Sequence, residues 1–135
     1  MRKSGTRGRR PLSKAQLLPL AADLVSRVSL KHHLALTCLV AGQGDLESLS
    51  TLTNVVEIVH YLDPTDVELI RRADDALVAC IERAKRSETF TLTDTERDEI
   101  AALLLYHDAQ LVRVPMHRYI DALECAIARD RQRAD

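Results

Sequence analysis

Apolar residues recur at helical spacing along most of the chain. In the clearest stretch, Leu49, Leu52, Val56 and Val59 follow one another at alternating intervals of three and four residues. This spacing places them on one side of a helix. Similar stripes follow at Val67, Ile70, Ala73, Leu77, Ile81 and Ala84, at Ile100, Leu103, Leu104, His107 and Leu111, and at Met116, Tyr119, Ile120, Leu123 and Ile127. Each stripe predicts an amphipathic helix with one buried face.

A different pattern marks residues 34–41. This run is apolar at almost every position, and Thr37 alone interrupts it. A helix that is apolar on all sides is normally covered on all sides. The run therefore predicts the central helix of the fold, which ends at Gly42 as its C-cap.

Residues that begin or end helices separate these stretches. Ser13 with Gln16, and Thr93 with Glu96, have the spacing of a capping box. The other predicted boundaries are a kink or a restart near Leu18, just before Pro19, and a break or a kink at Pro115. N-caps are predicted at Asp45 and at Asp63, which is followed by Pro64 at the first helical position.

Together these elements predict an all-α fold, an antiparallel bundle of five or six helices in a single domain over residues 11–135. The composition agrees, because Trp is absent and there are only four glycines and four prolines. A core built from Leu, Ala, Val and Ile with few helix breakers favours helix over sheet. Residues 1–10 contain no branched apolar side chain, so we expect them to form a disordered tail.

The predicted tail is strongly basic and contains no acidic residue; its cations are Arg2, Lys3, Arg7, Arg9 and Arg10. The whole chain has a net charge of −1, so removing this +5 leaves −6 on the remaining residues. A basic arm on an acidic body indicates a nucleic acid or an acidic partner. Residues 7–11, Arg-Gly-Arg-Arg-Pro, resemble the AT-hook core Arg-Gly-Arg-Pro with one additional arginine. The alternative is an arm that only keeps the protein in solution.

The candidate metal and catalytic residues do not combine into a known site. Glu57 and His60 have the spacing of a Glu-x-x-His metal-binding pair, but a di-iron bundle needs a second such pair, which the sequence lacks. The adjacent His32 and His33 point in different directions on a helix, and His107 fits a partly buried, hydrogen-bonded side chain. With no phosphate-binding loop and no nucleophile motif, we predict a non-enzymatic protein without metal or cofactor.

Three segments carry a resemblance to a known group of proteins. They are Leu30-Lys-His-His-Leu-Ala-Leu36, Gly42-x-Gly44 and Asp74-Asp-Ala-Leu-Val-Ala-Cys80, in that order after a basic start. This arrangement resembles small helical proteins carried by proteobacterial phages, plasmids and integrative elements, some of which are labelled Fis-like regulators. The resemblance implies that the protein originates from a mobile genetic element.

The functional hypothesis combines these observations. We expect a small helical binding protein that occupies a surface of a host or element-encoded protein. By this contact it would block a host defence complex, as anti-CRISPR proteins do. The alternative is an accessory transcriptional regulator that binds DNA through the basic tail and the C-terminal arginines Arg129, Arg131 and Arg133. No apolar run approaches the length of a membrane span, so we expect a cytoplasmic protein with no membrane contact.

The surplus of apolar surface also predicts self-association. The last stripe is wide for a terminal helix that packs on one neighbour, and closed two-fold dimers are the commonest way to cover such surface. We therefore expect a homodimer whose interface consists of Met116, Tyr119, Ile120, Leu123 and Ile127, with Tyr119 and Leu123 near its centre.

Overall fold

The computed structural model describes residues 11–134 and is all-helical in that range, as predicted. The basic residues of the predicted tail lie outside the described residues. The helices are α1 (Lys14–Leu17), α2 (Ala22–Val40), α3 (Leu46–Leu62), α4 (Val67–Ser87), α5 (Asp94–Leu111) and α6 (Met116–Ala134). No helix among them combines the length and the apolar composition that a bilayer crossing requires.

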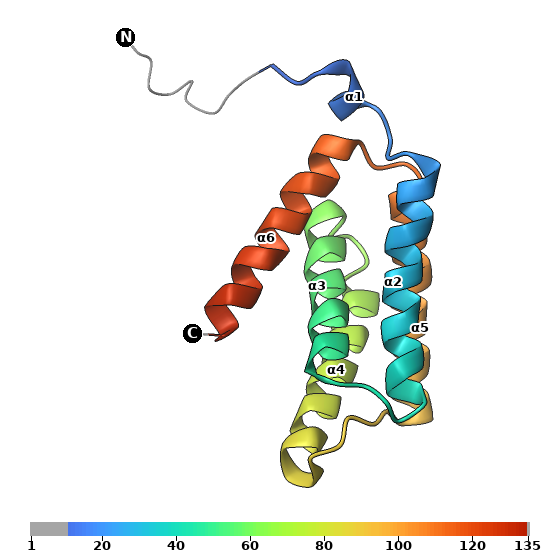
Figure 1. The fold of residues 1–135 in the computed structure, drawn as a ribbon, viewed down its shortest axis with the longest axis vertical. Coiled ribbons are helices and arrows are strands. Elements are labelled where there is room, and N and C mark those ends of the chain that lie inside the picture. Colours follow the sequence, from blue (N-terminus) through green and yellow to red (C-terminus); the bar gives the residue numbers. More distant parts are fainter. Residues whose placement is uncertain (1–10, 135) are drawn as a thin grey trace.

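Four of the helices form a bundle, and a fifth long helix lies outside it. Helices α2, α3, α4 and α5 alternate in direction, and each packs against the next; α5 also returns to pack against α2 and closes the square. Helix α6 lies on the opposite side of the molecule from α2 and α5 and packs mainly on α3 (Figure 1). The prediction of an antiparallel helical bundle is confirmed.

The central helix is α3, which has neighbours on most of its sides. Its buried residues are Leu49, Leu52, Val55, Val56, Ile58, Val59 and Leu62. The prediction that residues 34–41 are buried on all sides is wrong. Leu34 is 52% exposed and Val40 is 49% exposed, because α2 stands at an edge of the square and only its inner face meets α3 and α5.

Both predicted capping boxes are present. At the start of α1, the Ser13 hydroxyl accepts from the Gln16 backbone N–H at 3.3 Å, and the Ser13 N–H donates to the Gln16 side chain at 2.9 Å. At the start of α5, Thr93 and Glu96 make the equivalent pair at 3.1 and 3.0 Å. These bonds satisfy backbone N–H groups that have no partner within the helix.

The predicted restart before Pro19 is also confirmed. Leu18 has extended backbone geometry, and the next helix begins at Ala22. The Leu18 carbonyl accepts a hydrogen bond from the Met116 N–H at 2.9 Å. Pro115 separates α5 from α6 as expected. The hydrogen bond from Met116 to Leu18 connects this junction to the end of α1.

One predicted cap is wrong. Asp63 ends α3 rather than beginning α4, and the N-cap of α4 is Asp66, whose carboxylate accepts from the Leu69 N–H at 3.2 Å. The Asp63 carboxylate instead accepts from the Thr65 hydroxyl at 2.6 Å and from the Tyr106 hydroxyl at 2.8 Å. These bonds stabilise the turn between α3 and α4.

The turn after α2 depends on two glycines. Gly42 has a φ of +77°, the left-handed geometry expected of the residue after a helix C-cap. Gly44 packs so closely on α2 that an added Cβ would lie 2.2 Å from Leu39 Cδ2. The turn thus brings the start of α3 directly against the buried end of α2.

Candidate functional site

Two of the three C-terminal arginines form ion pairs within the fold instead of contributing to a second basic surface. Arg129 and Arg133 on α6 reach back to the Glu57 carboxylate on α3, at 3.3 and 3.0 Å. Arg133 also lies 3.5 Å from Asp130. These pairs hold the end of α6 against α3 and leave less unneutralised positive charge for a nucleic acid.

The same ion pairs involve Glu57, one member of the Glu57 and His60 pair. Glu57 binds the two arginines, whereas His60 is exposed. Within residues 11–134, no group of three or more His, Cys, Asp or Glu side chains is arranged to hold a metal ion. Glu57 is therefore an anchor for α6 in this structure.

Three histidines lie between α2 and α5 in two separate groups. His32 and His107 lie in the core, and His33 lies nearer the surface. His107 is fully buried, and its Nδ1 lies 2.9 Å from the Gln110 side-chain oxygen. The Gln110 amide donates to the Val59 carbonyl at 3.4 Å, so its oxygen is left to accept from His107. The prediction of a hydrogen-bonded His107 is confirmed, and the side chain is fully rather than partly buried.

The neighbouring His32 is buried against His107, while His33 lies on the outer side of the α2–α5 seam. The His33 Nε2 is 2.9 Å from the Asp108 carboxylate, which also accepts from the Ser29 hydroxyl at 2.7 Å. His32 and His33 thus point in different directions, as the sequence predicts, and the adjacent His107 and Asp108 do the same on α5. The pairing of His32 with His107, 75 residues apart, was not predictable from local spacing.

Most residues of the predicted dimer interface pack against other residues of the same chain. Tyr119 is buried in a core cluster with Ala122 and Ala126, and Met116 and Leu123 pack against the same cluster. Only the two isoleucines of the predicted set, Ile120 at 38% and Ile127 at 39%, are exposed. An interface centred on Tyr119 does not fit this structure, because α6 uses that face to pack on α3.

A hollow of about 690 Å³ lies on the surface between α3, α4 and α6. Its floor and walls are mainly apolar and include Leu46, Leu49, Ile81, Ala84 and Phe90. Leu49 and Ala84 are buried, whereas Leu46 is 72% exposed at the edge. We call this hollow the α3/α4/α6 groove.

Charged and polar side chains of both signs surround the groove; they are Glu47, Ser50, Lys85, Asp130 and Arg133. Most already have partners: the Ser50 hydroxyl donates to Asp130 at 3.2 Å, and Lys85 lies 3.5 Å from Glu82. The rim therefore needs little charge compensation from a ligand. An apolar floor with a polar rim can bind large apolar side chains.

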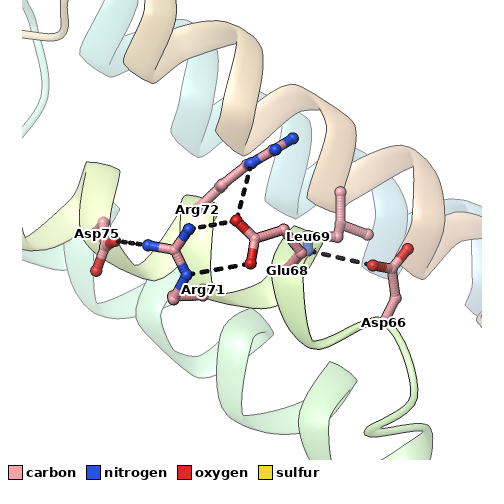
Figure 2. Close-up of polar contacts among 6 residues, drawn as sticks. All are labelled: Asp66, Glu68, Leu69, Arg71, Arg72 and Asp75. Carbon is pink, nitrogen blue, oxygen red and sulfur yellow. Dashed lines mark hydrogen bonds and ion pairs between the residues drawn. The ribbon is translucent and has the colours of Figure 1, made fainter.

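The outer face of α4 next to its N-terminus is very different. Figure 2 shows a continuous network in which Glu68 contacts Arg71 and Arg72, and Arg71 also binds Asp75 at 2.8 Å. These side chains are more than half exposed and neutralise one another. Such a surface is well hydrated and offers no apolar anchor.

Comparisons with protein-family models, with curated proteins and with solved structures found no match to this chain. The sequence did not reveal the groove, because its lining comes from four separate segments between residues 46 and 133. The one available signal was Phe90, whose aromatic side chain stands in a connector that needs no large residue for its own conformation.

Proposed function

We propose that this chain is a non-enzymatic binding protein that takes an apolar helical segment of a partner protein into the α3/α4/α6 groove. The observation that carries the proposal is the groove itself, about 690 Å³ of mainly apolar hollow with a rim of mixed charge. Concave apolar surfaces with few polar groups are the usual form of binding sites. An apolar centre within a polar rim is typical of protein interfaces.

The shape of the groove supports a helix as the occupant. Helices α3, α4 and α6 all contribute side chains to its lining, so the groove lies between helices. Amphipathic helices commonly bind in such grooves by inserting side chains spaced three and four residues apart. Leu46, Ile81 and Phe90 would contact those inserted side chains.

The resemblance to proteins of mobile genetic elements extends the proposal to the class of partner. A protein of that origin that binds without catalysis fits an inhibitor of a host defence complex, which it would block by occupying one component. DNA binding through Arg2, Lys3, Arg7, Arg9 and Arg10 remains the alternative. The ion pairs of Arg129 and Arg133 with Glu57 make the described C-terminus a weak contributor to it.

The test uses a displayed library of amphipathic helical peptides, selected against the full chain. We expect binders that lose about tenfold or more in affinity with either Leu46→Lys or Phe90→Glu. Val78→Lys is the matched control, because Val78 is 50% exposed on α4 and does not line the groove. Selection of no binder, or binders that Leu46→Lys and Phe90→Glu leave unchanged, would reject the groove as the site.

A second experiment separates the two functional alternatives. The full chain is used to capture proteins from a bacterial lysate with and without nuclease. The proposal requires that a captured protein persists after nuclease treatment, is lost with Leu46→Lys and is retained with Val78→Lys. Capture that disappears with nuclease, and that deletion of residues 1–10 also abolishes, would favour DNA binding.

A further inference from the structure

The fold joins two segments of the chain that contain basic residues and no acidic ones. Residues 1–20 contain six lysines and arginines, residues 111–120 contain two, and neither segment has an Asp or a Glu. The whole chain has a net charge of −1, so setting aside this +8 leaves −9 on the rest. The eight cations are Arg2, Lys3, Arg7, Arg9, Arg10, Lys14, Arg113 and Arg118.

Backbone contacts hold the two segments together where α5 meets α6. The Met116 N–H donates to the Leu18 carbonyl at 2.9 Å, and the backbone runs antiparallel where Pro19 meets Pro115. Helix α1 also packs on α6 (Figure 1). Residues 1–10 therefore join the described chain at Pro11, three residues before α1, at the end of the molecule that carries Arg113 and Arg118.

Arg113 and Arg118 are accessible to a ligand. Both are exposed, both line one hollow of about 220 Å³, and neither makes an ion pair within residues 11–134. Arg118 donates to the Leu62 carbonyl at 3.2 Å, which leaves its other N–H groups for a second acceptor. Asp63 also lines this hollow, but its carboxylate accepts hydrogen bonds from two hydroxyl groups instead.

We infer that this end of the molecule binds the phosphate backbone of double-stranded DNA. We call it the α1/α6 end and define it by residues 1–20 and 111–120. Residues 1–10 would lie along the duplex, and Arg113 and Arg118 would add a fixed contact from the helical body. Contacts from Arg and Lys to phosphates supply essentially all of the affinity of non-specific DNA binding. Ten residues span at most about 35 Å, or about ten base pairs, so all eight cations can reach one short duplex.

The side chains of the α1/α6 end favour a DNA duplex over other nucleic acids. Proteins that bind single strands stack the bases on aromatic side chains, and the only aromatic residue of these two segments, Tyr119, is buried. Residues 7–11 resemble the AT-hook core, an extended element that lies in the minor groove. The minor groove of B-form DNA is narrow, whereas that of an RNA duplex is wide and shallow.

The α1/α6 end and the α3/α4/α6 groove lie in different parts of the molecule. The groove is lined by the first turns of α3, the last turns of α4 and the last turns of α6. Helix α1 and the start of α6 lie at the opposite end from the end of α4 (Figure 1). A duplex bound at the α1/α6 end leaves the groove open, so this inference goes beyond the proposed function and either one can fail alone.

Fluorescence anisotropy of the full chain with a labelled duplex of about 20 base pairs tests the inference. Arg113→Ala combined with Arg118→Ala should weaken binding by about tenfold and reduce the slope of log K against log salt concentration by about 2, since each phosphate contact contributes about 0.9. The control combines Arg86→Ala with Arg131→Ala, which removes the same charge from two exposed arginines outside the α1/α6 end. We expect the control to keep the wild-type slope.

Arg113→Ala alone keeps the test valid if losing the bond from Arg118 to Leu62 unfolds the double variant, which circular dichroism detects. This single variant should reduce the slope by about 1. A wild-type slope for Arg113→Ala, or equal effects of the two double variants, would overturn the inference. Tighter binding to a single strand or to duplex RNA of the same sequence would overturn it too. Competition by poly-glutamate as strong as that of unlabelled duplex, at equal charge, would instead indicate an acidic protein partner.

Discussion

The imidazole rings of His32 on α2 and His107 on α5 lie against each other, with centroids 5.4 Å apart and planes tilted by 33°. Both side chains are buried, and His32 Nδ1 and His107 Nε2 have no hydrogen-bond partner among the described residues. Burial is the main cause that lowers the pKa of both rings, and it lowers the pKa of His32 from 6.5 to about 4. The fold therefore holds two neutral histidines in its core at neutral pH.

This pair predicts a loss of stability in mild acid. The unfolded chain protonates His32 near its ordinary pKa of 6.5, whereas the folded chain does so only near a pKa of about 4. The stabilisation is complete above the unfolded pKa and is lost as pH falls toward the folded pKa. The two values correspond to about 3 kcal/mol, to which the lowered pKa of His107 adds in the same direction.

Urea unfolding between neutral pH and about 4.5 measures this effect. The variant His32→Leu should show a shallower decline of the unfolding free energy than the wild type. The variant His60→Leu, at an exposed histidine, should follow the wild-type decline. Equal slopes for the wild type and His32→Leu would show that His32 does not drive the pH dependence.

Leu104 and Leu105 provide an internal comparison of buried and exposed positions. Leu104 is 1% exposed and packs in the main core, whereas Leu105 is 66% exposed on the outer side of α5. Leu104→Ala should reduce the free energy of unfolding by about 2–5 kcal/mol, and the buried Leu36→Ala should do the same. Leu105→Ala should change it by less than about 0.5 kcal/mol. Similar losses for Leu104→Ala and Leu105→Ala would contradict the orientation of α5.

Gly44 should be intolerant of any side chain. An added Cβ would lie 2.2 Å from Cδ2, 2.9 Å from Cγ and 3.0 Å from Cα of Leu39, which is itself 1% exposed. Gly44→Ala should therefore cost about 1–3 kcal/mol of stability through overpacking. Gly42→Asn is the matched change in the same turn: nothing lies within 4 Å of an added Cβ, and Asn tolerates the positive φ. Thermal unfolding of both variants should show the larger loss at position 44.

The contact between Arg83 and Glu96 links α4 to the start of α5. The two side chains make paired hydrogen bonds at 3.1 and 2.7 Å, and Glu96 also accepts from the Thr93 N–H at 3.0 Å. Glu96→Ala removes the ion pair and half of the capping box, so we expect a loss of about 2 kcal/mol. Glu82→Ala, which removes an exposed pair with Lys85, should cost less than about 0.5 kcal/mol. A comparable loss for both variants in urea unfolding would contradict this assignment.

The features that the sequence predicted well are those set by neighbouring residues. The Ser13 and Thr93 capping boxes and the break at Pro115 involve contacts within a few residues, so their patterns are readable. The buried faces of Leu49–Leu62 and Ile100–Leu111 follow from helical spacing. Asp63 failed as an N-cap because Asp66, three residues later, can make the same bond.

The features that could not be predicted from the sequence depend on which helices are neighbours in the fold. The run from Leu34 is apolar on all sides of α2, although α2 stands at an edge of the bundle. The sequence of a helix does not determine how many neighbouring helices it has. For the same reason the sequence places Tyr119 at a dimer interface, whereas in the structure its side of α6 packs on α3. The groove combines residues from Leu46 to Arg133 and requires the packing order.

The position of α6 outside the four-helix square has a consequence for local unfolding. Helix α6 packs mainly on α3, and beyond its first turns it is fastened by Ala122, Ala126 and the Glu57 ion pairs. A helix held on one side opens at a lower free energy than the bundle it rests on, so its amides should exchange with solvent earlier than those of α3. Since α6 forms one wall of the groove, a bound helix would slow that exchange.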